Sequence, residues 1–408
     1  MRVLFVHQNF PGQFRHTAIA LAADKANQVV ALCINPPAYE TPGVTIARYQ
    51  PRRTSAKDVH PLAADFETKV IRGEAAAAAA MELKKRGFEP DVIVVHPGWG
   101  EHIFITDVWP KARVLLFLEF FYRTEGYDFA FDPELSRDSL QGRARLRVKN
   151  ANLLTGFDVM DWGVSPTHWQ KSSLPAAFHD KVSVIFDGID TGFITPDPEA
   201  VFALPDGRSV RAGDEVLTFV NRNLEPYRGF HIFMRALPAI QKARPNAITL
   251  IVGGDDVSYG GKPSGGGTWR EVMMKEVGDQ LDMSRIVFLG RIPYPTYRQL
   301  LRVSRVHAYM TYPFVLSWSM LESLAAECLV VGSSTKPVTE VLRHGENGLL
   351  VDFFDVEGWA KALPEALAKP GAHGDIRKQA RRDIVERYDL HGICLPEQLK
   401  LIRRVAAM

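Results

Sequence analysis

The sequence has few cysteines and no long apolar segment. Cys33, Cys328 and Cys394 lie far apart in the 408 residues, and no pair has the spacing of metal ligands. So sparse and odd a count fits a reducing compartment better than a disulfide framework. The apolar runs are shorter than the roughly 18 residues that span a bilayer, and the N-terminus lacks the pattern of a secretory signal. We therefore expect a cytoplasmic protein, either soluble or peripheral to the inner face of the membrane.

The charges nearly cancel, and several cofactor motifs are missing. The formal net charge of +2 gives no reason to expect a nucleic-acid partner. No Gly-x-Gly-x-x-Gly opens a helix, as a dinucleotide fingerprint requires. Asp255 and Asp256 are adjacent rather than spaced as Asp-x-Asp. We therefore expect no nicotinamide, no metal and no other bound cofactor.

Short apolar runs alternate with helical patterns along the chain. Runs of continuous apolar character are typical of strands that are buried on both faces of a parallel sheet. The predicted strands of the first half are Val3–His7, Val29–Ile34, Val92–His96, Val114–Glu119, Trp162–Ser165 and Val182–Phe186. Those of the second half are Val216–Asn221, Ile248–Gly253, Ile286–Leu289, Val306–Met310, Leu329–Ser333 and Gly348–Val351.

Two strand–helix series in succession indicate two doubly wound α/β domains. The length of the chain also favours two hydrophobic cores. We expect domains at residues 1–190 and 191–385, and a C-terminal helix at 386–408 that returns to the first domain. The Pro/Gly-rich segment Asp187–Asp214 is expected to be a linker and hinge.

In open α/β sheets, ligands bind beyond the carboxyl ends of the strands. In the first half, Gly12 lies in a Pro-Gly turn that either only joins a strand to a helix or brings backbone N–H groups to a phosphate. His96 is either a satisfied strand-end histidine or a catalytic one. Glu119 lies in an apolar run, where a carboxylate needs a partner or a function, and we expect it to be a catalytic residue. The expected acceptor cleft is lined by His96 and Glu119 together with Trp99, Glu101, Tyr122 and Arg123.

In the second half, Arg222 and Arg228 bracket a loop that leads into a helix. Two guanidinium groups there suit a diphosphate, although both could be ordinary surface arginines. Ser317 and Ser319 begin another helix, and Glu322 lies one turn further, where its carboxylate could accept ribose hydroxyls or complement the helix dipole. The Gly-rich segment Gly253–Trp269 is expected to be mobile and near the donor.

The motifs of the second half resemble those of the retaining glycosyltransferases of family 4. They include NRNLEPYRGF, FLGRI, YPF followed by SWSMLESLA, and VVGSSTKPVTEVLRHGENGLLVDFFD. The resemblance covers most of the chain and implies the GT-B fold, in which two Rossmann-like domains each carry one substrate. It also implies a nucleotide-diphosphate sugar, linked to UDP or GDP, as the donor.

Individual residues carry what the resemblance implies. Arg222 and Arg228 look like the pair that binds the donor diphosphate and acts in catalysis, and Glu322 looks like the glutamate that holds the ribose. Other residues resemble positions that contact the nucleotide or its phosphates: Gly12, Gly254, Arg291, Ile292, Leu316, Ser317, Trp318 and Ser319. Phe314 stands where the family has a glutamate that contacts the hydroxyls of the donor sugar, so the transferred sugar is open.

The resemblance favours a metal-independent hexosyltransferase of polysaccharide or glycoconjugate synthesis, with a glycan or lipid-linked acceptor. Two alternatives stay open: a sugar-nucleotide epimerase on the same fold, and a non-catalytic protein that binds nucleotide sugars or glycans. The basic run Gln141–Lys149 is either a solvated helix face or a contact for anionic lipid.

Overall fold

The computed structural model describes residues 1–408, apart from the side chain of Pro370. The chain forms two compact units. Unit 1 consists of Met1–Gly188 and His391–Met408, and unit 2 consists of Ile189–Leu390. The first boundary therefore falls after residue 188, where we expected 190, and unit 2 extends to residue 390, where we expected 385.

Unit 1 contains a parallel sheet of seven strands in the order β3-β2-β1-β4-β5-β6-β7. The strands are β1 (Arg2–Val6), β2 (Gln28–Cys33), β3 (Val44–Arg48), β4 (Val92–Val95), β5 (Arg113–Phe117), β6 (Trp162–Ser165) and β7 (Val182–Val184). Six of them match predicted runs. The sequence prediction missed β3, because this edge strand is only half-buried and lacks a continuous apolar run.

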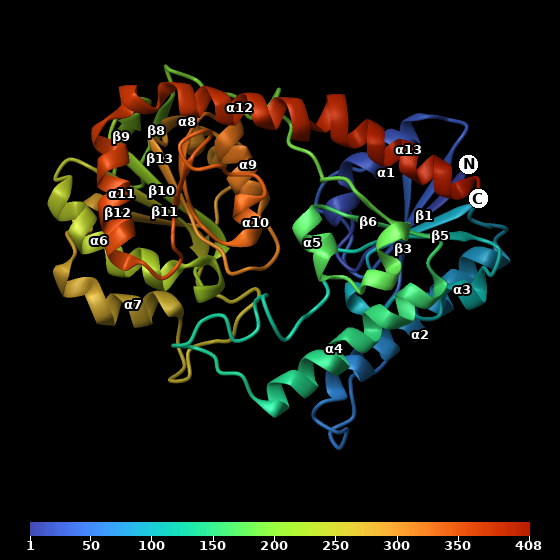
Figure 1. The fold of residues 1–408 in the computed structure, drawn as a ribbon. Coiled ribbons are helices and arrows are strands. Elements are labelled where there is room, and N and C mark those ends of the chain that lie inside the picture. The colour runs from blue at the N-terminus through green and yellow to red at the C-terminus, as the bar shows by residue number, and fades with distance from the viewer. The chain divides into compact units, whose positions relative to one another are not determined.

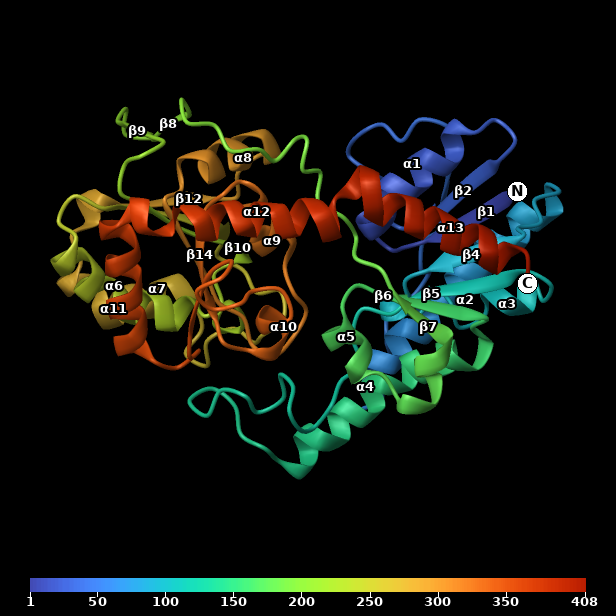
Figure 2. The same ribbon diagram turned by 45° about the horizontal axis from the view of Figure 1, so that its top comes forward.

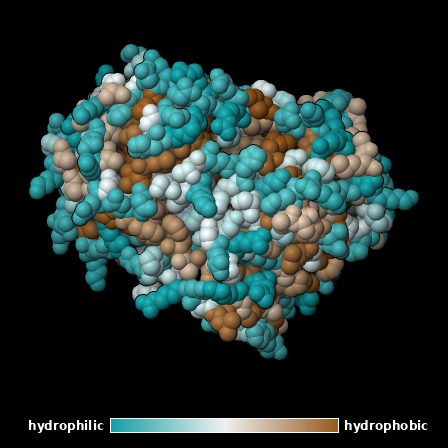
Figure 3. Space-filling model, viewed as in Figure 1, coloured by the Kyte–Doolittle hydropathy of each residue, from teal (hydrophilic) through white to brown (hydrophobic). Residues whose placement is uncertain are grey.

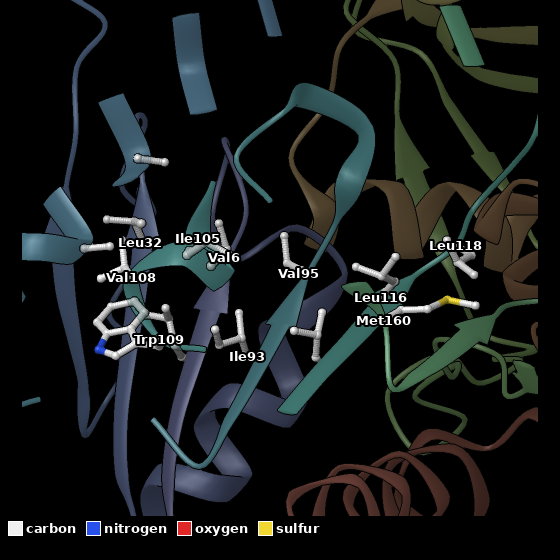
Figure 4. Close-up of a cluster of buried hydrophobic side chains, with 14 of the residues drawn as sticks. Val6, Leu32, Ile93, Val95, Ile105, Val108, Trp109, Leu116, Leu118 and Met160 are labelled. Carbon is white, nitrogen blue, oxygen red and sulfur yellow. The ribbon is translucent and has the colours of Figure 1, made fainter. Parts of the chain in front are cut away.

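Helices cover both faces of this sheet, as the ribbon shows (Figure 1). The principal helices are α1 (Arg15–Ala23), α2 (Ala64–Lys85), α3 (Ile105–Val108), α4 (Leu140–Val159), α5 (His168–Ser173) and α13 (Leu395–Ala406). Successive side chains of a strand point to opposite faces. Leu4 and Val6 therefore join one core with α2, α3 and α4 (Figure 4), whereas Val3 and Phe5 join a second core with α1 and α13.

The C-terminal helix α13 belongs to unit 1. Leu401, Ile402 and Val405 are buried in the core that α1 shares, and Gln398 donates from its Nε2 to the carbonyl of Phe186 at 2.8 Å. Figure 2 shows α13 running across the strands of the unit 1 sheet. The segment that precedes it, α12 (Gly374–Tyr388), belongs to unit 2, and a π-helical turn at Leu390–Cys394 joins the two helices.

Unit 2 contains a parallel sheet of six strands in the order β12-β11-β10-β13-β14-β15. Its strands are β10 (Val216–Asn223), β11 (Ile248–Gly254), β12 (Ile286–Gly290), β13 (Val306–Tyr309), β14 (Leu329–Ser333) and β15 (Leu349–Val351). Besides α12, its helices are α6 (Phe230–Ala243), α7 (Trp269–Val277), α8 (Tyr294–Val303), α9 (Trp318–Ala325), α10 (Lys336–Thr339) and α11 (Val356–Ala368). The predicted fold class of two Rossmann-like domains is confirmed.

The expected linker Asp187–Asp214 was interpreted wrongly over most of its length. Within it, β8 (Val201–Ala203) and β9 (Ser209–Arg211) form an antiparallel hairpin that belongs to unit 2. Phe202 and Val210 are buried there. The proline and glycine residues that suggested a linker flank this hairpin and form its turn.

None of the helices that the structure describes is both long and apolar enough to cross a bilayer. On the face shown in Figure 3, hydrophilic residues predominate and hydrophobic ones form separate patches.

The packing of α13 predicts that Ile402→Ala destabilises unit 1 by about 2–5 kcal/mol, because it removes a buried side chain and leaves a cavity. Lys400→Ala, on the exposed side of the same helix, is the control and should stay within about 0.5 kcal/mol. Urea unfolding followed by circular dichroism measures both. Equal effects of the two substitutions would show that α13 is not part of this core.

Candidate functional site

The order of the strands marks one point in each sheet where ligands are expected. The connections leave in opposite directions at the pair β1–β4 in unit 1 and at the pair β10–β13 in unit 2. Such a switch point opens a crevice beyond the carboxyl ends of the strands. Most of the polar residues singled out in the sequence follow these strands or their direct neighbours, and Arg291 follows β12, one strand further out.

In unit 1, the structure brings His96 and Glu119 together. His96 directly follows β4, and Glu119 lies two residues beyond β5. The Nε2 atom of His96 lies 3.5 Å from Oε2 of Glu119. The side chain of Glu119 is 35% exposed, whereas His96 is nearly buried and stacks on Trp99 with ring centroids 4.5 Å apart.

The hydrogen bonds of His96 fix the position of its proton. The backbone N–H of Gly98 donates to Nδ1 of His96 at 3.1 Å, so Nδ1 carries no proton. In the neutral ring the proton is then on Nε2, which faces Glu119. Burial raises the pKa of Glu119, but the proximity of His96, with smaller contributions from His7 and Gln13, outweighs it, and the net pKa is lowered. Unit 1 thus presents an ionised carboxylate at the carboxyl ends of its strands.

Gly12 lies close to this carboxylate, against the ring of His7. Its φ is +47°, and a Cβ added there would lie 2.4 Å from Nε2 of His7, so only glycine fits. The turn QNFPGQF is therefore packed onto a histidine at the switch point, which is more than the plain connection between a strand and a helix that the sequence also allowed.

Not all the expected lining residues face an open site. Glu101 is fully buried, accepts a hydrogen bond from the hydroxyl of Tyr49, and has its pKa raised by burial. Arg123 donates from Nε and Nη2 to the carbonyls of Ser173 and Leu174 at 2.6 and 2.8 Å. The expectation that Glu101 and Arg123 line an acceptor cleft is corrected: both support the surrounding backbone or core.

The basic run on α4 divides into two parts. Arg143, Arg145 and Arg147 are exposed, as a solvated helix face requires. Lys149 instead turns toward the protein, and its Nζ lies 3.7 Å from the centroid of the Tyr122 ring.

In unit 2, two arginines lie at the carboxyl ends of β10 and β12, which flank β11 in the sheet. Arg222 is exposed near the end of β10, and Arg291 directly follows β12. Nη2 of Arg291 donates to Oδ1 of Asn223 at 2.8 Å. A Cβ on Gly254, at the end of β11, would lie 2.7 Å from Nε of Arg291, so glycine lets this guanidinium cross the strand end. Ile292 follows and is half-buried.

Arg228 occupies a different environment from Arg222, because it is 5% exposed. Its Nη1 donates to Oγ1 of Thr311 at 2.8 Å and to the carbonyl of Val315 at 2.9 Å. The ring of Tyr259 lies over its guanidinium at 5.0 Å. In this structure Arg228 therefore holds the segment before α9 in place, and Arg222 and Arg291 are the accessible cations.

The segment before α9 presents the start of a helix at the same edge of the sheet. Leu316 is buried, and Ser317 caps the helix by accepting a hydrogen bond from the N–H of Ser319 at 3.3 Å. The N–H of Ser317 donates to the hydroxyl of Tyr309 at 2.9 Å, and Trp318 is exposed. A helix start of this kind attracts anions through its free N–H groups and its dipole.

Glu322, one turn into α9, is 7% exposed, and burial raises its pKa. Its Oε1 accepts a hydrogen bond from the hydroxyl of Tyr294 at 2.6 Å. Tyr294 is exposed and stacks on Phe193, with ring centroids 5.5 Å apart. The carboxylate that we expected to receive ribose hydroxyls thus receives a tyrosine hydroxyl.

The Gly-rich segment Gly253–Trp269 has fixed contacts where we expected mobility. The carboxylate of Glu225 accepts hydrogen bonds from the N–H groups of Ser258, Tyr259 and Gly260 at 3.0, 3.2 and 2.9 Å. Because Glu225 is itself buried, these bonds satisfy a charge that would otherwise be costly. They also place Tyr259 over Arg228.

Phe314 belongs to an aromatic group at the same edge. Its ring centroid lies 5.6 Å from that of Tyr227 and 5.1 Å from that of Tyr259. The position at which the sequence resemblance leads one to expect a carboxylate is thus filled by a buried aromatic ring.

Sequence reasoning missed three residues of these sites: Glu225, His7 and Gln13. A carboxylate between two arginines is the sequence signal that could have marked Glu225. The position of His7 directly after the first strand is a comparable signal. Nothing in the sequence spacing joins Gln13 to Glu119, from which it is 106 positions away.

Comparison with known proteins decides the family. Residues 25–194 match the family model described as glycosyl transferase family 4 group, and residues 206–383 match the one described as glycosyl transferases group 1. The chain belongs to the glycosyl transferases of group 1. This glycosyl transferase family is the one that the motifs of the second half resemble.

Curated relatives and solved structures agree with this assignment. The chain is 27% identical over 233 residues to a D-inositol 3-phosphate glycosyltransferase of Thermobispora bispora. The aligned region covers 55% of this chain and 53% of that protein. A protein of the same name from Mycolicibacterium smegmatis is 28% identical over 211 residues, covering 50% of this chain and 44% of that one. The chain spans about half the length of the curated relatives it matches.

Solved structures match along the whole chain. The sucrose-phosphate synthase of Thermosynechococcus elongatus has a TM-score of 0.73 at 19% identity, with 100% of both chains covered. The Anabaena protein HepE in complex with UDP-glucose has a TM-score of 0.64 at 15% identity, with 100% of this chain and 99% of that chain covered. These likenesses show the GT-B fold.

The contacts of Glu225 predict that Glu225→Ala releases residues 258–260, because three backbone N–H groups lose their acceptor. We expect faster amide hydrogen exchange at these positions and a loss of stability of about 1–3 kcal/mol. Glu365→Ala, at an exposed position of α11, is the control. Unchanged exchange in the Glu225 variant would show that other contacts hold the segment.

Proposed function

We propose that this chain transfers a sugar from a nucleotide-diphosphate sugar, linked to UDP or GDP, to a hydroxyl of an acceptor, with retention of the anomeric configuration. The observation that carries the proposal is that Arg222, Arg291 and the start of α9 all lie at the carboxyl ends of the unit 2 strands. Family membership supports the reaction class. The UDP-glucose bound to HepE supports the class of donor.

In this proposal unit 2 holds the donor. Arg222 and the start of α9 bind the diphosphate, and they stabilise the negative charge that grows on it as the bond to the sugar breaks. Arg228 has an indirect role, because its hydrogen bonds to Thr311 and Val315 hold the loop that leads into α9. Glu322 receives the ribose hydroxyls in exchange for the hydroxyl of Tyr294.

The donor sugar lies near Phe314 in this proposal. A buried ring there makes no hydrogen bond to a sugar hydroxyl, so the sugar is held through its apolar face and through backbone groups. This distinguishes the chain from the pattern that the family resemblance implies, in which a carboxylate contacts the sugar.

Unit 1 provides the acceptor side. Glu119, ionised and held by His96, accepts a hydrogen bond from the acceptor hydroxyl and orients its oxygen. A glycan or a lipid-linked glycan is the proposed acceptor, at the cytoplasmic side of a membrane, and polysaccharide or glycoconjugate synthesis is the proposed context.

Arg222→Ala tests the donor site. Loss of one group that stabilises transition-state charge should lower kcat by about 10²- to 10³-fold. Release of UDP or GDP from a panel of nucleotide sugars measures it. Arg208→Ala is the matched control, because Arg208 is exposed in the β8–β9 turn and pairs with Asp206. Turnover that is unchanged in Arg222→Ala contradicts the donor site.

The stereochemistry has its own test. Proton NMR of the glycoside product should show the transferred sugar with the anomeric configuration that it has in the donor. An inverted product contradicts the retaining mechanism. It does not bear on the donor site, which Arg222→Ala tests separately.

A further inference from the structure

A chain of hydrogen bonds leads from β1 to the carboxylate of Glu119. The N–H of Asn9 donates to Nδ1 of His7 at 3.0 Å. Nε2 of His7 lies 3.1 Å from Oε1 of Gln13, and Nε2 of Gln13 donates to Oε1 of Glu119 at 3.3 Å. The first turn of the chain thus ends on a carboxylate that lies 106 positions further along the sequence.

The direction of each hydrogen bond follows from the first. Because Nδ1 of His7 accepts from a backbone N–H, the proton of the neutral ring is on Nε2. That N–H donates to the side-chain oxygen of Gln13, which leaves the amide of Gln13 to donate to Glu119. Nε2 of His96 lies 3.5 Å from the other oxygen, Oε2, so each oxygen of Glu119 has a side-chain nitrogen near it.

His7 keeps this direction because its ring stays neutral. Burial, with a smaller contribution from His96, lowers the pKa of His7 to about 3. At neutral pH the ring therefore has one N–H and one acceptor nitrogen, and the Gln13 amide cannot reverse without losing its bond to His7.

The loop that carries Gln13 is held firmly. Phe10 and Phe14 flank the turn and are buried, and both rings pack on Phe5, with centroids 6.5 and 5.3 Å apart. The N–H of Phe14 donates to the carbonyl of Pro11 at 2.8 Å. Gln13 therefore approaches Glu119 from a fixed backbone.

We propose that Gln13, oriented by His7, is a positioning residue that holds the carboxylate of Glu119 and points its free lone pairs at the acceptor hydroxyl. This inference rests on the proposed role of Glu119 as the residue that receives that hydroxyl. It goes beyond that role because it assigns the orientation of the carboxylate to the first turn of the chain.

The groups that face Glu119 from the surrounding elements are few. His7 lies on the side of β1 and His96 on the side of β4, and both lower the pKa of Glu119. Gln170 of α5 donates to the backbone carbonyl of Glu119 at 2.8 Å and so holds the main chain rather than the carboxylate. Gln13 is thus the neutral donor on the carboxylate, and its removal changes no formal charge.

The test compares Gln13→Met with the intact protein. Methionine has a similar length and no N–H, so the pKa of Glu119 should rise. We expect the midpoint of its titration, followed by carboxyl ¹³C NMR and assigned with Glu119→Gln, to move up by about one pH unit. The acid limb of the pH profile of kcat/KM for the acceptor should move with it, whereas the KM for the nucleotide sugar stays unchanged.

Gln28→Met is the matched control. Gln28 is exposed at the start of β2, at the end of the strands opposite to Glu119. His7→Phe supplies a second variant, which keeps a ring against Gly12 and removes only the polar atoms. It should move the midpoint in the same direction by a smaller amount, since Gln13 remains but is no longer oriented.

Midpoints of Glu119 that are the same in Gln13→Met, His7→Phe and the intact protein would overturn the proposal. A purely structural role would lower the thermal stability of the variants without moving the pH profile, and that result would overturn it as well. Full transfer activity of Glu119→Gln would instead contradict the proposed function, whereas the NMR titration judges the contact of Gln13 with Glu119 without any turnover.

Discussion

Burial of both faces of each parallel sheet is the constraint on which the rest of the structure depends. A strand covered by helices on two sides has no place for a charge along its length, so polar side chains gather where the strands end. His96 and Glu119 follow β4 and β5, and Arg222 and Arg291 lie at the ends of β10 and β12. The same burial makes every charge near those ends require a partner, and the hydrogen bonds of Glu119, Glu225 and Glu322 are the result.

The two units use this edge in different ways. Unit 2 presents two accessible guanidiniums and the start of a helix, which together suit a diphosphate. Unit 1 presents one carboxylate, which receives an N–H from Gln13 and lies beside His96, whose ring stacks on Trp99. Arg228 connects packing to function in unit 2, since a buried guanidinium fixes the loop before α9 and Tyr259 covers it. In the proposed transferase, buried charged groups such as Arg228 and Glu225 hold the loops of the site in place. The exposed arginines Arg222 and Arg291 bind the substrate.

Much of the fold could be predicted from the sequence, because twelve apolar runs followed by helical patterns are a direct consequence of buried parallel strands. The half-exposed strand β3 and the β8–β9 hairpin could not, since neither has a continuous apolar run. Of the site, the strand-end residues could be predicted from their places in the pattern. Their partners could not. The contact of Gln13 with Glu119 and that of Glu225 with residues 258–260 join segments whose meeting is decided by the tertiary fold, and the burial of Arg228 depends on the path of the Gly-rich segment.

The central claim is that the edge of the unit 2 sheet at Arg222, Arg291 and α9 receives the nucleoside diphosphate. A crystal structure of the protein with UDP or GDP tests this most directly. The account predicts that the diphosphate lies within hydrogen-bonding distance of Arg222 and the N–H groups at the start of α9, and that a ribose hydroxyl replaces the hydroxyl of Tyr294 on Glu322. A nucleotide bound elsewhere, with Tyr294 still on Glu322 and Arg222 facing solvent, would contradict it.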